Sequence, residues 1–154
     1  GSTFIIKIPF KIASTPDKVN KQTSEIKIDG LNLLLVEDNE LNAEIAETLL
    51  SDEGAAVTVA KDGSQAVNIF KEKPEGSFDA ILMDIMMPVM DGLTATKKIR
   101  TLNHPDAKKI PIIAMTANAF KEDKEKCLAA GMNAHLAKPI EIENVKKVLC
   151  EQIR

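Results

Sequence analysis

Short apolar runs and amphipathic segments alternate along the chain from residue 31 to its end. Five of these runs are rich in aliphatic residues and short, which is typical of strands covered on both faces of a sheet. They lie at 33–36, 56–60, 80–83, 110–115 and 134–137. Five strands that alternate with five helical segments predict an α/β fold with a parallel sheet and right-handed crossovers.

Each predicted helix is marked by apolar residues three or four positions apart, one face of an amphipathic helix. The fourth is predicted over 120–130, where Gly131 ends it as a left-handed cap, and an Asp62-Gly63 turn precedes the second. The marking residues in the other four are Leu41, Ile45, Leu49 and Leu50; Ala66, Ile69 and Phe70; Leu93 and Ile99; and Ile142, Val145 and Leu149.

The first thirty residues do not follow this pattern. Residues 3–10 alternate as one strand that would need a partner sheet, and 11–30 are polar, mixed in charge and broken by Pro16. The latter composition is typical of a linker. We therefore predict three parts: an isolated strand within 1–10, a linker over 11–30 and one domain over 31–154.

Composition narrows the classes of function. The chain has 154 residues, 44% of them hydrophobic, and a net charge of −3, which gives no electrostatic footprint for nucleic acid or an anionic membrane. No apolar run approaches the length of a membrane span. Cys127 and Cys150 are expected to be reduced thiols, with a disulfide as the open alternative. These features predict a cytoplasmic domain.

Polar residues capable of chemistry stand where the predicted strands end. The carboxyl ends of parallel strands lie at one edge of a sheet, where such folds bind ligands. We expect one cleft to gather residues that follow or close the first, third, fourth and fifth strands. They are Glu37 and Asp38, Asp84, Thr116, and Lys138.

Three carboxylates at close range repel one another unless a cation is present. Mg²⁺, a hard cation that prefers oxygen ligands, would together with the ammonium of Lys138 balance their charge. Phosphoryl transfer needs mainly positioning and neutralisation of charge. We therefore predict that Asp84 attacks a phosphoryl group in line, while Lys138 and Thr116 hold its oxygens.

Structural interpretations are preferred at other positions. Asp91, before Gly92, is predicted to cap a helix. The methionines between 83 and 90 have no cysteine or histidine beside them, so packing is favoured over a soft-metal site. His104, next to Pro105, is predicted to be a surface loop residue.

Four motifs together resemble the receiver domain of two-component response regulators. They are Val36-Glu37-Asp38-Asn39, Met83-Asp84-Ile85-Met86-Met87-Pro88-Val89-Met90-Asp91-Gly92, Met115-Thr116-Ala117 and Ala137-Lys138-Pro139. The resemblance implies a flavodoxin-like doubly wound sheet with strand order 2-1-3-4-5. It also implies that Asp84 is the phosphoacceptor.

Further site roles are implied by the same resemblance. Asp38 would bind Mg²⁺ directly and Glu37 mainly through water, and the backbone carbonyl of Met86 would complete the protein ligands. Thr116 and Lys138 would contact the phosphoryl group. His135 stands where the family usually has a Tyr or Phe switch residue, so the resemblance leaves its switching role open.

Residues 1–10 resemble the closing strand of a histidine-kinase ATP-binding domain. A kinase domain followed by a linker and a receiver domain is the order found in hybrid sensor kinases. The chain is then expected to be the cytoplasmic receiver of such a parent, which could itself be membrane-anchored, and to catalyse only its own phosphorylation and dephosphorylation. Its expected partners are a phosphohistidine donor and a histidine phosphotransfer protein. The alternative is a non-phosphorylated docking module. An aspartate-based phosphohydrolase is rejected because Met86 stands where that class has a second Asp.

Overall fold

The computed structural model of the protein describes residues 27–117 and 121–153. The expectations for residues 1–10, and for the linker up to residue 26, lie outside the described residues. Within these ranges, ten elements alternate strictly between strand and helix. The strands are β1 (Asn32–Val36), β2 (Ala56–Ala60), β3 (Ala80–Asp84), β4 (Ile112–Thr116) and β5 (Ala134–Ala137). The helices are α1 (Glu40–Asp52), α2 (Gly63–Glu72), α3 (Gly92–Thr101), α4 (Lys121–Ala130) and α5 (Ile142–Gln152).

The five strands form one parallel sheet in the order β2-β1-β3-β4-β5. This confirms the predicted fold class, the number of strands and helices, and the strand order. β1 and β3 are neighbours at the centre although 43 residues separate Val36 from Ala80 in the numbering. The change of direction in strand order therefore falls between β1 and β3, and their carboxyl ends lie side by side.

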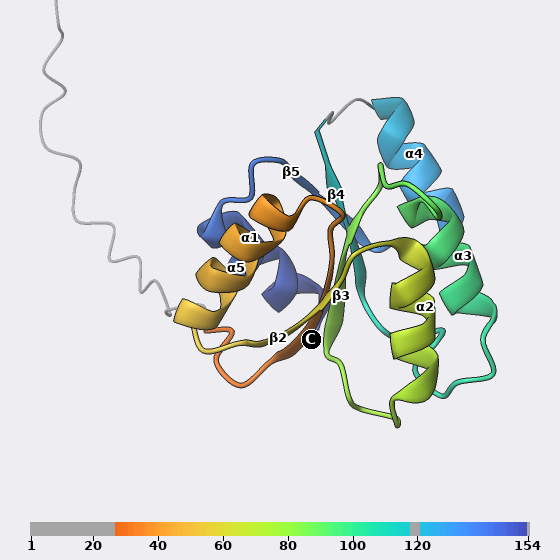
Figure 1. Cartoon of the computed structure of the whole chain (residues 1–154), viewed down its shortest axis with the longest axis horizontal. Helices are drawn as coiled ribbons and strands as arrows, with labels where there is room; N and C mark the ends of the chain where they lie inside the picture. Colours follow the sequence, from red (N-terminus) through yellow and green to blue (C-terminus); the bar gives the residue numbers. More distant parts are fainter. Residues whose placement is uncertain (1–26, 118–120, 154) are drawn as a thin grey trace, which may run out of the picture.

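Helices cover the sheet in two layers, with α1 and α5 on one face and α2, α3 and α4 on the other (Figure 1). Alternate strand residues point into opposite layers, as the pleat requires. On β1, Leu34 and Val36 join the cluster beneath α2, α3 and α4, whereas Leu33 and Leu35 join the cluster beneath α1 and α5. Burial on both faces explains why β1, β3 and β4 are continuous apolar runs.

Helix α1 presents a different face to the core than its leucines suggest. Leu41 and Ile45 are 65% and 52% exposed, whereas the buried residues are Ala43, Ala46 and Leu50. Small alanines bring α1 close to the sheet, and the larger side chains are left outside. The helix itself was predicted correctly, but two of the four residues that marked it are on its exposed surface.

Smaller differences concern the ends of elements. Gly63, predicted in a turn, is the first residue of α2, and Asp62 caps that helix by accepting a hydrogen bond from the backbone N–H of Gln65 at 2.9 Å. β4 begins at Ile112, two residues later than predicted. Gly131 has a φ of +98° after α4, which confirms the predicted left-handed cap. Phe120, the predicted start of that helix, lies outside the described residues.

Ile28 is fully buried in the cluster beneath α1 and α5, although it precedes β1. The chain around it is held by a hydrogen bond from the N–H of Gly30 to the carbonyl of Gly54 at 2.9 Å. The boundary between linker and domain at residue 31 stays a prediction. The packing shows that Ile28, which that boundary leaves outside, contributes to the core.

We expect Ile28→Ala to lower the free energy of unfolding by about 2–4 kcal/mol, because it removes buried methyl groups and leaves a cavity. Urea denaturation followed by circular dichroism measures the change. Leu128→Ala, at a position 63% exposed on α4, is the matched control and should change stability little. Equal stability of Ile28→Ala and the native chain would show that Ile28 does not pack as described.

Candidate functional site

The register of the central strands brings together residues from distant parts of the chain. Val36 pairs with Met83, so the residues that follow them, Glu37 and Asp84, lie side by side at the carboxyl edge. On the other side of β3, Asp84 pairs with Met115, the residue before Thr116. The sheet therefore builds the cleft that the strand ends predicted.

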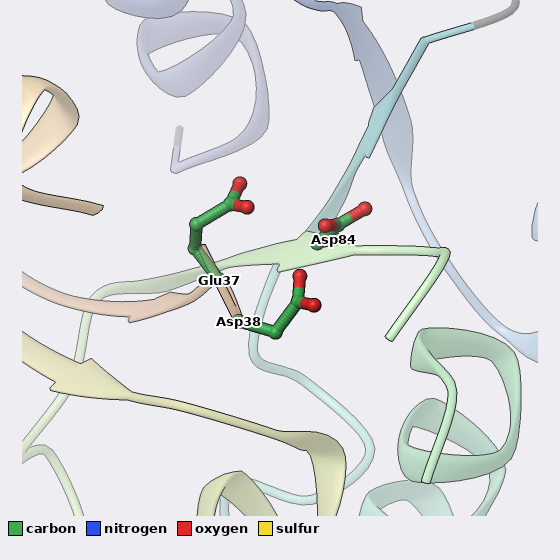
Figure 2. A group of neighbouring side chains, drawn as sticks. All are labelled: Glu37, Asp38 and Asp84. Atoms are coloured by element: carbon green, nitrogen blue, oxygen red, sulfur yellow. The ribbon is translucent and has the colours of Figure 1, made fainter. Parts of the chain in front are cut away.

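Three carboxylates gather at this edge. Glu37, Asp38 and Asp84 each offer an oxygen that lies within 4.8 Å of the others (Figure 2). Glu37 and Asp84 are buried, at 3% and 4% exposure, while Asp38 is exposed. Of the three carboxylates that could bind a metal ion, one is therefore accessible to solvent and two are buried.

Lys138 lies between the two buried carboxylates. Its Nζ donates to Glu37 Oε2 at 2.6 Å and to Asp84 Oδ2 at 2.7 Å. Its backbone N–H donates to the carbonyl of Thr116 at 2.8 Å, which fixes the start of the β5–α5 loop to the end of β4. The lysine is therefore positioned at both its backbone and its side chain.

The electrostatics of the pair follow from this burial. Burial raises the pKa of Asp84, and the nearby charge of Glu37 adds to the rise, although Lys138 and the N–H of Met86 oppose it. Burial alone would lower the pKa of Lys138, but its hydrogen bonds and charge interactions with Asp84 and Glu37 are stronger, so its pKa is raised. Lys138 thus does not fully offset the cost of the buried charge of Asp84, which favours an added cation beside it.

Of the remaining predicted site residues, Thr116 and Met86 lie next to Asp84 along the sheet edge and the chain, whereas His135 lies farther away on β5. Thr116 closes β4 and is 8% exposed, and Met86 follows Asp84 by two residues with its N–H donating to Asp84 Oδ1 at 3.1 Å. His135 is half-buried on β5, where it pairs with Ala114. Burial, together with the positive charge of Lys124, lowers the pKa of His135.

The donor set fits Mg²⁺. Its three side-chain ligands are carboxylates, and a partly exposed site leaves room for the waters that this ion keeps. The buried negative charge exceeds what one lysine balances. Glu37, Asp38 and Asp84 are therefore the residues that would hold such an ion.

The loop from β3 to α3 contains features that sequence reasoning missed. Val89 has a φ of +66°, a left-handed conformation rare for a β-branched residue, and the N–H of Met90 donates to the carbonyl of Pro88 at 2.7 Å. Asp91 caps α3 by accepting from the N–H of Thr94 at 2.7 Å, which confirms its structural interpretation. No turn signal such as glycine or asparagine marks Val89 in the sequence.

A groove of about 340 Å³ adjoins the cleft on the α1 side. It shares Glu37 and Lys138 with the cleft and is otherwise lined by residues of α1 and of the β5–α5 segment. These are Asn42, Ile45, Ala46, Pro139 and Ile140. The exposed Ile45 thus lies beside the carboxylate site.

Comparison with known proteins agrees with this geometry. A family model described as the response regulator receiver domain matches residues 33–150. Hybrid signal transduction histidine kinase I of Dictyostelium discoideum is 43% identical over 123 residues, which are 79% of this chain and 7% of that protein. The signal transduction histidine-protein kinase BarA of Escherichia coli is 42% identical over 127 residues, covering 82% of this chain and 13% of that protein.

Solved structures show the same fold. The receiver domain of sensor histidine kinase PA1611 from Pseudomonas aeruginosa, with a magnesium ion coordinated in its active site cleft, is 44% identical with a TM-score of 0.72; the match covers 80% of this chain and 98% of that one. The Saccharomyces cerevisiae complex of Ypd1 with the receiver domain of Ssk1 gives 34% identity and a TM-score of 0.68, covering 79% and 88%. This chain spans only 7% and 13% of the length of the two curated relatives named above.

Proposed function

Because this chain belongs to the response regulator receiver domain family, we propose that Asp84 is the residue at which it accepts a phosphoryl group from a phosphohistidine. The observation that carries this assignment is the position of Asp84. Its carboxylate is buried at the carboxyl edge of the central strand, contacts Lys138 and lies among the carboxylates of the cleft.

The chain's own residues account for the transfer. An oxygen of Asp84 forms a bond to phosphorus as the bond between phosphorus and the donor histidine breaks, and the histidine leaves with the electron pair. Lys138 exchanges a carboxylate oxygen for a phosphoryl oxygen, and the hydroxyl of Thr116, at the end of the adjacent strand, donates to another. Mg²⁺ held by Glu37, Asp38 and Asp84, with the carbonyl of Met86, would neutralise charge on the phosphoryl oxygens.

Phosphorylation adds a charge of roughly −1.5 to −2 at the cleft. Thr116 is the nearest hydroxyl on β4, and His135 lies on the paired strand β5. We propose that movement of Thr116 toward the phosphoryl group is followed by movement of the His135 ring, which alters the surface of α4, β5 and α5.

Two relatives from Dictyostelium discoideum are named hybrid signal transduction histidine kinases, so we propose that this receiver acts within a parent of that kind. Its partners are then a phosphohistidine donor domain and a histidine phosphotransfer protein. In the part of the chain that the structure describes, no helix is long and apolar enough to cross a membrane.

The direct test is incubation with acetyl phosphate and Mg²⁺, followed by intact-protein mass spectrometry. A phosphoryl increment that is lost when EDTA removes the metal is expected. Absence of the increment under conditions that label another receiver domain would refute the assignment and favour the alternative, a docking module that is not phosphorylated.

A partner that delivers its histidine to Asp84 must cover the cleft, and two of the elements next to the cleft carry exposed apolar side chains. Leu41 and Ile45 are on the α1 side, and Met86 and Val89, 81% and 86% exposed, are on the β3–α3 loop. Together these four residues form an apolar rim. Large apolar side chains that stay exposed next to a site are a common mark of a protein interaction surface.

We expect Ile45→Glu to slow phosphoryl transfer from phosphorylated Ypd1 by about tenfold or more, since an apolar contact with the partner becomes a buried, unpaired charge. The rate of phosphorylation by acetyl phosphate should stay unchanged, because this small molecule reaches Asp84 without binding to the apolar rim. The matched control is Leu128→Glu on α4, in the opposite layer. An equal loss in that control would show that the rim does not receive the partner.

A further inference from the structure

The β3–α3 loop, residues 85–91, carries the Met86 backbone beside Asp84, and its two ends are held by main-chain hydrogen bonds. The N–H of Ile85 donates to the carbonyl of Met115 at 3.2 Å, and the N–H of Gly92 donates to the carbonyl of Ile85 at 3.0 Å. These bonds close the loop at its base. They do not fix its far side, which contains the left-handed Val89.

The far side of the loop is joined to α2. The backbone N–H of Gly63 donates to the carbonyl of Met90 at 3.1 Å. Gly63 is the first residue of α2, where N–H groups have no partner within the helix and the helix dipole favours a carbonyl oxygen. The carbonyl of Met90 thus accepts a hydrogen bond from the first turn of α2, as the side chain of a helix-capping residue would.

Only a glycine allows this contact. A Cβ at position 63 would lie 2.6 Å from the Met90 carbonyl oxygen and 2.8 Å from the Cβ of Ala95. The first of these atoms belongs to the backbone, so the clash is relieved only if the backbone of the loop or of the first turn of α2 moves. Gly63 has no left-handed φ, and its requirement for glycine is therefore one of space and not of conformation.

We propose that Gly63 is a positioning residue for the phosphorylation site, acting through the Met90 carbonyl to hold the β3–α3 loop. Displacing Met90 shifts the loop that includes Met86, whose N–H contacts Asp84 and whose carbonyl is the proposed metal ligand. Val89, next to Met90, has a left-handed φ that is unfavourable for a β-branched residue, so we expect its conformation to change when the loop moves. This inference rests on the proposed function for the role of the metal, while the contact itself is independent of it.

Gly63→Ala tests the proposal through Mg²⁺ affinity, measured by isothermal titration calorimetry. Changes in residues that orient metal ligands typically cost about 10–100-fold in affinity, so about tenfold weaker binding is expected. The control is Ala66→Gly, which weakens the same helix one turn later and should leave Mg²⁺ affinity unchanged. Native affinity in Gly63→Ala, or an equal loss in Ala66→Gly, would overturn the proposal.

The double variant Gly63→Ala with Ala95→Gly separates loop from helix packing, because it removes the clash between side chains and keeps the clash with the carbonyl. Mg²⁺ binding should stay weak in this variant. Recovery of native affinity would assign the effect to packing of α2 on α3 and contradict the proposal.

Native protein provides a measurement that needs no variant. The Gly63 amide should exchange slowly with solvent, and its NMR resonance should shift with Mg²⁺ at the same affinity as that of Met86. Exchange as fast as in an exposed loop would overturn the proposal. Mg²⁺ binding without labelling by acetyl phosphate would instead refute the proposed function and leave the Gly63 results valid.

Discussion

Replacing Asp84 by asparagine is expected to abolish phosphorylation and to make the metal-free protein harder to unfold. Asparagine lacks the nucleophilic oxygen, so no phosphoryl increment should appear with acetyl phosphate and Mg²⁺. It is nearly the same size as aspartate and carries no charge, so it removes the cost of burying a carboxylate next to Glu37. We expect a gain of about 1 kcal/mol, a common size for substitutions that relieve a functional site.

The pH dependence of this gain has a definite sign. Because burial raises the pKa of Asp84 above its unfolded value, the buried charge costs stability once the pH rises from near 3.8 through the folded pKa. The advantage of Asp84→Asn should therefore be present at neutral pH and disappear in acid. Urea denaturation at a series of pH values measures it.

Asp91→Asn is the matched control, because asparagine caps a helix as well as aspartate does. The Asp91→Asn variant should show the same phosphoryl increment and the same free energy of unfolding as the native protein. Labelling of Asp84→Asn at another residue, or a loss of stability at neutral pH, would contradict the account of the cleft.

Lys138→Met is expected to have the opposite effect on stability. Methionine keeps much of the side chain's volume but leaves Glu37 and Asp84 buried without their shared cation. Breaking a buried ion pair from one side typically costs about 3–5 kcal/mol, and we expect about 3 kcal/mol in the metal-free protein. Phosphorylation should be slower by about 10²–10³, as for loss of one preorganised charge-stabilising group.

Mg²⁺ and pH should each modify this loss. The proposed Mg²⁺ site would neutralise the same carboxylates in the native state, so adding Mg²⁺ should narrow the gap in melting temperature between Lys138→Met and the native protein. Without Lys138 the pKa of Asp84 rises further, so the loss should be largest at neutral pH and shrink as the pH falls. Calorimetric melting with and without Mg²⁺ at two pH values checks both expectations.

Lys61→Met is the control for loss of a lysine. Lys61 also pairs with a carboxylate, Glu40 at 2.8 Å, but both side chains are exposed. An exposed pair contributes little to stability, so this variant should melt like the native protein. A comparable loss in both variants would show that burial of the Lys138 pair is not the cause.

The sequence predicted the sheet and the cleft well because both depend on short-range patterns. Strands buried on both faces are continuous apolar runs, and the residue after such a run reaches the carboxyl edge wherever the strand lies in the sheet. Asp84 could be assigned to the edge in this way. The order of the strands came from the resemblance, and the described sheet confirms it.

The parts that could not be predicted depend on contacts between elements. Leu41 and Ile45 have the spacing of a core face, but alanines on another face of α1 pack on the sheet instead. Gly63 was interpreted as a turn residue because its contact with Met90, 27 positions later, leaves no local signal. The left-handed Val89 was missed for the same reason, since the surrounding loop and not its residue type imposes that conformation.

The division of the core into two layers has a consequence for how this domain meets other proteins. The α1 half of the rim and the adjoining groove lie on the layer of α1 and α5, whereas α2, α3 and α4 cover the opposite face (Figure 1). A protein that exchanges phosphate over α1 would therefore leave that opposite face accessible. On the proposed function, we expect that a second protein would find this face free while the first is bound, so that the phosphoryl donor would not have to dissociate before the next protein binds.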